Sequence, residues 1–202
     1  MYQFIETIYF KDNEMPLRHW HEQRFAKTQI AHFGKLQYLS LSELIALKQP
    51  DDVLKNQVYK IRVVYSESNA SITFQPYHKK EINHLHLVWN DTIDYSFKYL
   101  DRTALEQMKV PFENDAEIII VKNGWLTDTT FTNIALFNGN EWHTPGTPLL
   151  EGTQRAFLLQ QQTIIPALIH VNNLHHYTKI RLFNAMVCWE EAWELPIAAL
   201  QF

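Results

Sequence analysis

Cysteine and glycine are both scarce in this sequence. Cys188 is the single cysteine among 202 residues, which excludes an internal disulfide framework and fits a reducing compartment. Of the five glycines, four lie between positions 124 and 152. Glycine serves where φ is positive or where the backbone must approach another group closely. The clustering therefore directs attention to that stretch of the chain.

The sequence also lacks a basic surplus and a long apolar run. The formal net charge is −4, so a basic surface for nucleic acid is not expected. No stretch approaches the roughly 20 apolar residues that a membrane-spanning helix needs. The first ten residues alternate in polarity and include Glu6, a pattern typical of a strand and not of a signal peptide. We therefore expect a cytoplasmic protein that binds neither nucleic acid nor membranes.

Several well-known site motifs are missing. The chain has no G-x-S-x-G, no P-loop, no dinucleotide fingerprint and no H-E-x-x-H. His84 and His86 would share one face of a strand, but no carboxylate or cysteine stands at a familiar companion spacing. We therefore expect no metal site.

What is present is a mixture of strand and helix patterns. Runs of β-branched and aromatic residues predict strands at 2–10, 59–65, 71–77, 83–89, 116–121, 132–137, 179–183 and 195–200. Helical spacing and capping signals predict helices at 17–30, 42–47, 99–108 and 154–162, with Ser42 as the N-cap of the second. In the first helix, Leu17, Trp20, Arg24 and the pair Lys27 and Thr28 follow one another at helical spacing and define one face. Asn123-Gly124 predicts a turn, and the polar, aperiodic segment 78–82 predicts a linker. These patterns indicate an α+β protein with a small domain at 1–77 and a larger domain at 83–202.

An ordered set of short motifs spreads over the whole chain. It comprises Phe4-Ile5-Glu6-Thr7, His21-Glu22-Gln23-Arg24-Phe25, Phe97-Lys98-Tyr99-Leu100-Asp101-Arg102, Gly124-Trp125-Leu126-Thr127-Asp128 running into Thr132-Asn133, Leu150-Glu151-Gly152-Thr153-Gln154-Arg155, and Leu182-Phe183-Asn184-Ala185-Met186. In this order and spacing, the set resembles the class IV aminotransferases, the fold-type IV pyridoxal-phosphate enzymes. The resemblance implies two domains: a small α+β domain and a larger, strand-rich domain that resembles an α/β barrel.

The resemblance also implies the roles of individual residues toward pyridoxal 5'-phosphate. Lys98 would form an imine with the cofactor aldehyde and move protons, and Asp128 would stand where the family has a glutamate facing the pyridine nitrogen. The remaining implied cofactor contacts gather around the phosphate: Arg24, Gly152, Thr153, Gln154, Asn184 and Ala185. Arg102 is either a contact for a substrate carboxylate or a residue of the helix surface.

Within the family, Arg102 after Lys98 and the late Asn184-Ala185-Met186 resemble aminodeoxychorismate lyase, in a form without the leading hairpin of longer members. The resemblance then implies elimination of pyruvate from 4-amino-4-deoxychorismate to give 4-aminobenzoate, the folate precursor. One alternative is a transaminase acting on branched-chain or D-amino acids, and another is an inactive relative with a binding role. A small amino substrate, a homodimer and joint action with aminodeoxychorismate synthase are the expected partnerships.

Overall fold

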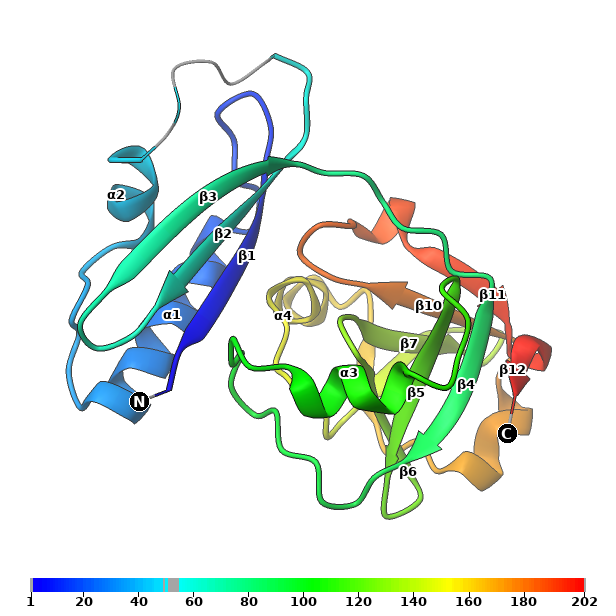
Figure 1. Cartoon of the computed structure of the whole chain (residues 1–202). Coiled ribbons are helices and arrows are strands. Elements are labelled where there is room, and N and C mark those ends of the chain that lie inside the picture. Colours follow the sequence, from blue (N-terminus) through cyan, green and yellow to red (C-terminus); the bar gives the residue numbers. More distant parts are fainter. Residues whose placement is uncertain (1, 49, 51–54, 202) are drawn as a thin grey trace. The chain divides into compact units, whose positions relative to one another are not determined.

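The computed structural model describes residues 2–48, 50 and 55–201, and these form two compact units. Unit 1 comprises residues 1–79 together with 97–101, and unit 2 comprises residues 80–96 and 102–202 (Figure 1). The first boundary falls inside the expected linker at 78–82. Lys98 belongs to unit 1 by its contacts, whereas the sequence placed it in the second domain.

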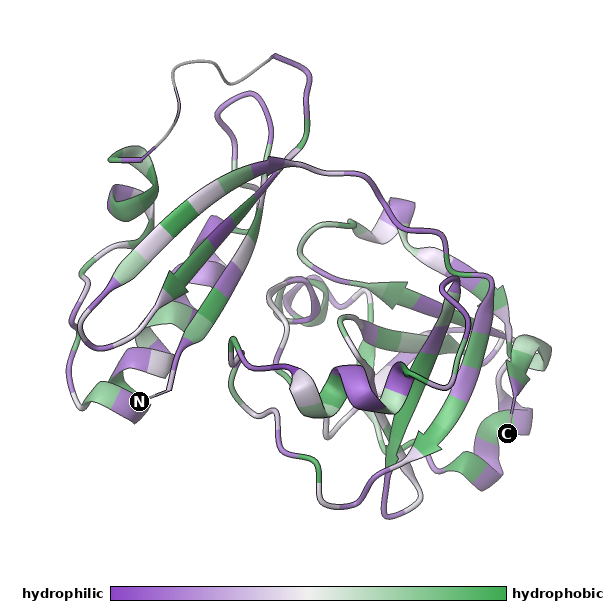
Figure 2. Cartoon of the chain, viewed as in Figure 1, coloured by the Kyte–Doolittle hydropathy of each residue, from purple (hydrophilic) through white to green (hydrophobic). Residues whose placement is uncertain are grey.

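Unit 1 is a three-stranded antiparallel sheet with two helices. The sheet has the order β1-β2-β3, and its elements are β1 (Phe4–Phe10), β2 (Tyr59–Tyr65), β3 (Ala70–Pro76), α1 (Arg18–Phe33) and α2 (Leu41–Ala46). Side chains alternate along β2, so that Tyr59, Ile61, Val63 and Tyr65 are all buried. The core contains these residues together with others from β1, α1 and α2. Figure 2 shows the corresponding mixture of hydrophobic and hydrophilic positions along α1.

Two details of unit 1 differ from the sequence prediction. The buried face of α1 consists of His21, Phe25, Thr28 and Gln29, one position away from the expected face through Trp20 and Arg24. The N-cap of α2 is Ser40 and not Ser42, because Ser40 Oγ accepts the Glu43 amide at 3.3 Å. The Ser42 hydroxyl instead donates to Glu22 at 2.7 Å.

Unit 2 contains two sheets and two α-helices. The sheets have the orders β11-β10-β7-β8-β9 and β12-β4-β5-β6. The elements are β4 (His84–Trp89), α3 (Thr103–Lys109), β5 (Ala116–Lys122), β6 (Trp125–Thr129), β7 (Asn133–Phe137), β8 (Trp142–Pro145), α4 (Thr153–Gln160), β9 (Ile165–Ala167), β10 (Lys179–Phe183), β11 (Trp193–Pro196) and β12 (Leu200–Gln201), with 3-10 turns at Val171–His176, Trp189–Glu191 and Ile197–Ala199. The β6 strand contacts β7 and β8 of the other sheet.

The strand β5 is an inner strand of its four-stranded sheet in unit 2. It pairs in parallel with β4 and in antiparallel with β6, and six of its seven residues are buried. The turn between β5 and β6 places Asn123 at φ 50° and Gly124 at φ 81°, which is the conformation that an Asn-Gly hairpin turn requires. The Cβ of any other residue at Gly124 would lie 2.3 Å from Nε2 of His170. The expected turn at Asn123-Gly124 is therefore confirmed.

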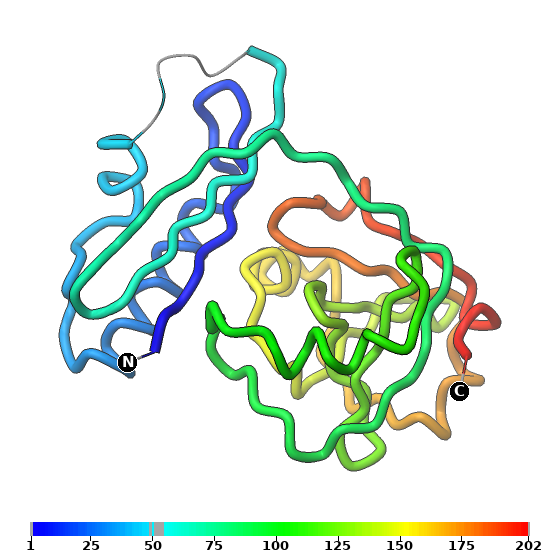
Figure 3. Tube along the Cα trace, viewed as in Figure 1, coloured from blue at the N-terminus to red at the C-terminus, as the bar shows by residue number. Residues whose placement is uncertain are grey.

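Three predictions for the second half were wrong. No strand was expected over Trp125–Thr129, yet β6 occupies it, because its register is set by pairing with β5. The strand expected at 195–200 is divided by the 3-10 turn Ile197–Ala199. The helix expected at 99–108 begins at Thr103, because the Tyr99 backbone bridges to Phe4 of β1 instead. The chain path from β4 to α3 can be followed in green in Figure 3.

Within the described residues, no helix has the length and apolar character needed to cross a membrane.

Candidate functional site

A buried cluster of charged side chains lies in unit 1. The Glu6 carboxylate, with 0% exposure, accepts a hydrogen bond from Arg24 Nε at 2.9 Å and another from Arg24 Nη2 at 2.6 Å. His21 Nδ1 lies 2.6 Å from Oε2 of the same carboxylate. Paired, nearly parallel bonds from a guanidinium fork to a carboxylate are among the stronger protein contacts. Glu6 therefore holds Arg24 and His21 in fixed positions.

The surroundings of Glu6 and His21 shift the pKa values of both side chains. Burial disfavours the Glu6 anion, but the Arg24 charge and the hydrogen bonds from His21 and Arg24 outweigh it and hold the pKa of Glu6 at about 2. Burial lowers the pKa of His21, the hydrogen bond and charge of Glu6 oppose this, and the charges of Arg24 and Lys98 lower it further. At neutral pH Glu6 is thus an anion and His21 is a neutral imidazole.

Lys98 lies in unit 1 because its segment runs alongside β1. The Lys98 carbonyl accepts the Ile5 amide at 2.9 Å, and the Leu100 amide donates to the Gln3 carbonyl at 2.8 Å. The lysine is half-buried, and its charge acts on His21. The structure therefore brings Lys98 and Arg24, two of the predicted site residues, into one unit around Glu6 and His21.

The remaining predicted residues belong to unit 2, and Asp128 is central among them. Its Oδ1 accepts Asn133 Nδ2 at 2.8 Å, and its Oδ2 accepts the Leu150 amide at 2.8 Å. Burial raises the pKa of Asp128 to about 6, although the bonds from Leu150 and Asn133 and the charge of Arg155 oppose the shift. Asp128 is therefore a buried carboxylate whose charge changes near neutral pH.

The start of α4 contacts the same group of residues. Gly152 is the N-cap and a Cβ at that position would lie 1.9 Å from Asn133 Oδ1, so glycine is required there. Thr153 and Gln154 follow and are buried at 3% and 4% exposure. Arg155 is 8% exposed and donates from Nη2 to the Pro145 carbonyl at 2.9 Å, but its buried Nε has no hydrogen-bond partner.

Asn184 and Ala185 lie beside the turn that follows Asp128. Asn184 Nδ2 donates to the Phe131 carbonyl at 3.3 Å, and its Oδ1 accepts the Met186 amide at 2.8 Å. Ala185 is half-buried. Asn184 therefore contacts the turn, residues 129–132, that follows Asp128, and Gly152 lies against Asn133 at the end of that turn.

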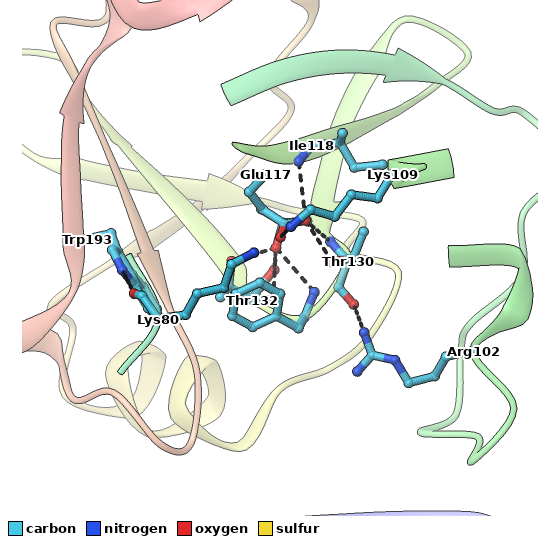
Figure 4. A network of polar contacts seen from close by, with 10 residues as sticks. Lys80, Arg102, Lys109, Glu117, Ile118, Thr130, Thr132 and Trp193 are labelled. Carbon is cyan, nitrogen blue, oxygen red and sulfur yellow. Dashed lines mark hydrogen bonds and ion pairs between the residues drawn. The ribbon is translucent and has the colours of Figure 1, made fainter. Parts of the chain in front are cut away.

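A polar network supports this turn from its other side (Figure 4). The Thr130 amide and hydroxyl both donate to Oε1 of the fully buried Glu117, at 3.2 and 2.7 Å, and Lys109 Nζ donates to Oε2 at 2.9 Å. Arg102 Nη2 donates to the Thr130 carbonyl at 2.9 Å. The structure thus gives Arg102 a contact with the turn that follows Asp128.

Sequence reasoning assigned no role to Glu6, His21 or Arg155. Glu6 could have been found, because it occupies the same alternating row of β1 as Phe4 and Ile8 and so predicts a buried charge that needs partners. Arg155 carried no such signal, since its burial depends on the packing of α4.

Two further features of unit 2 are formed by residues other than the predicted ones. A cavity of about 390 Å³ is lined by Lys122, Trp125 and Thr127 together with residues 93–96 and 147–149. At the surface, His84 lies near Glu113 and Asp115 with ligand-type atoms within 4.8 Å of one another. The sequence did not predict this grouping, because both carboxylates are about 30 residues away along the chain.

Comparison with known proteins identifies relatives of the whole chain. A Haemophilus influenzae protein of unassigned function is 32% identical over 188 residues, which are 92% of this chain and 98% of that protein. A Haemophilus somnus 129PT protein, provisionally described as a 4-amino-4-deoxychorismate lyase, is 34% identical with a TM-score of 0.84, and the match covers 92% of this chain and 97% of that one. No protein-family model matches the sequence.

More distant structures share the fold. A Mesorhizobium loti protein, provisionally described as an amino-acid aminotransferase, has a TM-score of 0.78 at 18% identity, covering 100% of this chain and 99% of that one. A Mycobacterium tuberculosis protein described as a hypothetical aminotransferase, solved in its PLP-bound form, has a TM-score of 0.71 at 13% identity, and the match covers 98% of this chain and 81% of that one. The chain belongs to the class IV aminotransferase family, the fold-type IV enzymes that use pyridoxal phosphate.

The residues present fit such a cofactor chemically. A lysine amine and an arginine lie together in unit 1, which suits an aldehyde and a phosphate. In unit 2 a buried carboxylate with a pKa of about 6 suits a ring nitrogen, and the N-terminus of α4, which has no side-chain cap, suits an anion.

Proposed function

We propose that this protein is a pyridoxal-phosphate-dependent 4-amino-4-deoxychorismate lyase that releases pyruvate and 4-aminobenzoate. The observation that supports the proposal most is the match at 34% identity, over nearly all of both chains, to a protein provisionally described as such a lyase. Arg102 after Lys98 adds support, because this pair resembles the lyase members of the family.

The bound cofactor supplies an electron-withdrawing pyridine ring that acidifies the carbon bearing the substrate amine. Lys98 would hold the cofactor and then take the proton from that carbon. Asp128 would face the ring nitrogen and keep it protonated, which its buried, ionisable carboxylate suits. Cleavage of the neighbouring C–O bond would then release the enolate of pyruvate and leave the ring aromatic, and uptake of one proton by that enolate would give pyruvate.

The phosphate would be held by charge and by backbone. Arg24 has one fixed orientation because Glu6 holds its Nε and Nη2. The amides of Gly152, Thr153 and Gln154 begin α4, whose N-terminal dipole favours an anion, and no side chain caps that end. Asn184 and Ala185 would close the other side of the phosphate site.

The decisive assay uses 4-amino-4-deoxychorismate beside a panel of D- and L-amino acids with a keto-acid acceptor. The lyase proposal expects pyruvate and 4-aminobenzoate in equal amounts, and Lys98→Ala should abolish both. Transamination of a panel member without 4-aminobenzoate release would instead establish the aminotransferase alternative, which the fold shared with the Mesorhizobium loti protein favours.

We also propose that the chain assembles as a homodimer. Aromatic residues make up 13% of the sequence, and several large apolar side chains of unit 2 are exposed, among them Trp89 at 52% and Val110 at 78%. Light scattering at micromolar concentration should give twice the mass of 24.0 kDa. A monomer with full activity would contradict the dimer.

Joint action with aminodeoxychorismate synthase is a further part of this proposal. Co-purification of the two proteins would test it.

A further inference from the structure

Glu6 is a charged side chain in a row of core residues. Successive side chains of a strand point to opposite faces, so Phe4, Glu6, Ile8 and Phe10 share one face of β1, and all four are buried to 2% exposure or less. An ionised carboxylate at such a position is strongly unfavourable unless it is paired. An apolar residue would fill the row at lower cost, so the carboxylate needs a reason other than packing.

The partners of Glu6 define the protonation of His21. Because Glu6 is ionised, its oxygens can only accept, so the proton between Oε2 and His21 Nδ1 belongs to the histidine. Burial keeps His21 neutral, so that proton is its only ring proton. His21 is therefore held as one tautomer, with Nδ1 as donor and a lone pair on Nε2.

Lys98 lies within electrostatic reach of this cluster. Its carbonyl accepts the amide of Ile5, the residue next to Glu6 in β1. Its charge is one of the influences that lower the pKa of His21. Among the described residues, the charged or titratable groups that act on one another here include Glu6 from β1, His21 and Arg24 from α1, Tyr65 from β2 and Lys98 itself.

We infer that Glu6 is a positioning residue for Lys98: it fixes the Arg24 fork and the His21 tautomer in the unit that contains Lys98, and it balances the Arg24 charge. This inference rests on the proposed function, in which Lys98 holds the cofactor. Arg24 alone would push Lys98 toward the neutral amine, and Glu6 offsets that push. The two residues therefore have opposite effects on the amine.

The test measures how fast Lys98 is acylated as a function of pH. It uses the full chain freed of cofactor, with circular dichroism to verify the fold and peptide mass spectrometry to follow Lys98. Glu6→Gln should shift the midpoint of the rate profile to lower pH, and Arg24→Met should shift it to higher pH, each by about one unit. Both midpoints equal to wild type would overturn the inference.

Two controls separate charge balance from loss of structure. Glu22→Gln alters a carboxylate of the same helix that binds the Leu41 and Ser42 amides, outside the cluster, and should leave the midpoint unchanged. Should Glu6→Gln fail to fold, the double variant Glu6→Gln, Arg24→Met removes both charges and leaves none unpaired. Its midpoint should return to within a few tenths of a unit of wild type, and a larger shift would contradict charge balance.

Nitrogen-15 NMR of the His21 ring gives a second readout. Wild type should show a neutral ring protonated on Nδ1, whereas a ring protonated on Nε2 or on both nitrogens would contradict the role given to Glu6. Failure of the cofactor role proposed for Lys98 looks different, because wild-type protein would then not retain pyridoxal phosphate on Lys98. Retention of the cofactor with unshifted midpoints would defeat the inference about Glu6 alone.

Discussion

The buried hydrogen bond between Asp128 and Asn133, 2.8 Å long, exists only because residue 152 has no side chain. Asn133 Nδ2 bonds both the Asp128 carboxylate and the Leu150 carbonyl, and its Oδ1 occupies the position that a Cβ at residue 152 would need. The Asp128 carboxylate, the Asn133 side-chain amide and the start of α4 thus hold one another in position.

Gly152→Ala should break this arrangement. The added methyl would displace Asn133 and leave the buried Asp128 with one partner fewer, at a cost of about 2 kcal/mol or more in the free energy of unfolding. Gly146→Ala is the matched control, because the Cβ there would meet the Ala167 carbonyl at an ordinary 3.5 Å. Denaturant unfolding of both variants checks this, and equal stabilities would refute the close contact at Gly152.

Asp128 should make the cofactor-free protein less stable as pH rises. Its pKa is about 6 in the folded state against 3.8 ordinarily, so the folded state binds the extra proton between these values. The free energy of unfolding therefore falls from pH 4 to pH 6, by about 3 kcal/mol for this group alone. Asp128→Asn should remove that slope, and parallel wild-type and variant curves would count against it.

Arg24→Ala should destabilise unit 1 as well as weaken phosphate binding. The variant leaves the Glu6 carboxylate buried without its guanidinium partner, which costs about 3–5 kcal/mol. The pH dependence of the free energy of unfolding should also reverse in the variant. In wild type the low pKa of Glu6 gives stability that is present above pH 4.5 and lost toward pH 2, whereas the variant should gain stability on acidification. Adding Glu6→Gln to Arg24→Ala should recover most of the lost free energy of unfolding. Thermal unfolding of wild type, the single variant and the double variant as a function of pH measures these effects.

Arg102 is expected to act through the turn after Asp128. Arg102→Met removes the bond to the Thr130 carbonyl and should lower the free energy of unfolding by about 1–2 kcal/mol. Glu106→Gln, which alters an exposed ion pair with Arg102 at 3.8 Å, should have little effect. If Arg102→Met left stability unchanged but raised KM for the substrate, the substrate-carboxylate reading would be favoured instead.

The order of the sequence motifs predicted the residues of the site but not their division between units: Lys98 and Arg24 belong to unit 1, and Asp128 and Gly152 belong to unit 2. The Asn123-Gly124 turn followed from backbone preferences. The helix expected from Tyr99 failed because helical spacing in 99–108 was outweighed by pairing of Tyr99 with Phe4, a contact across 95 residues that no local pattern encodes.

Burial of charge was the other property that local reasoning missed. The partners of Glu6 lie 15 and 18 residues away on a helix, and the expected face of that helix was displaced by one position. The partnerless Nε of Arg155 likewise depends on how α4 packs within unit 2.

The central claim is that Lys98 binds pyridoxal phosphate, and borohydride reduction tests it most directly. Purified protein should be yellow, and reduction should attach the cofactor permanently to a lysine. Peptide mapping should find the label on Lys98, and Lys98→Ala should remain folded and colourless. A label on Lys122 or Lys35, or no label at all, would contradict the account.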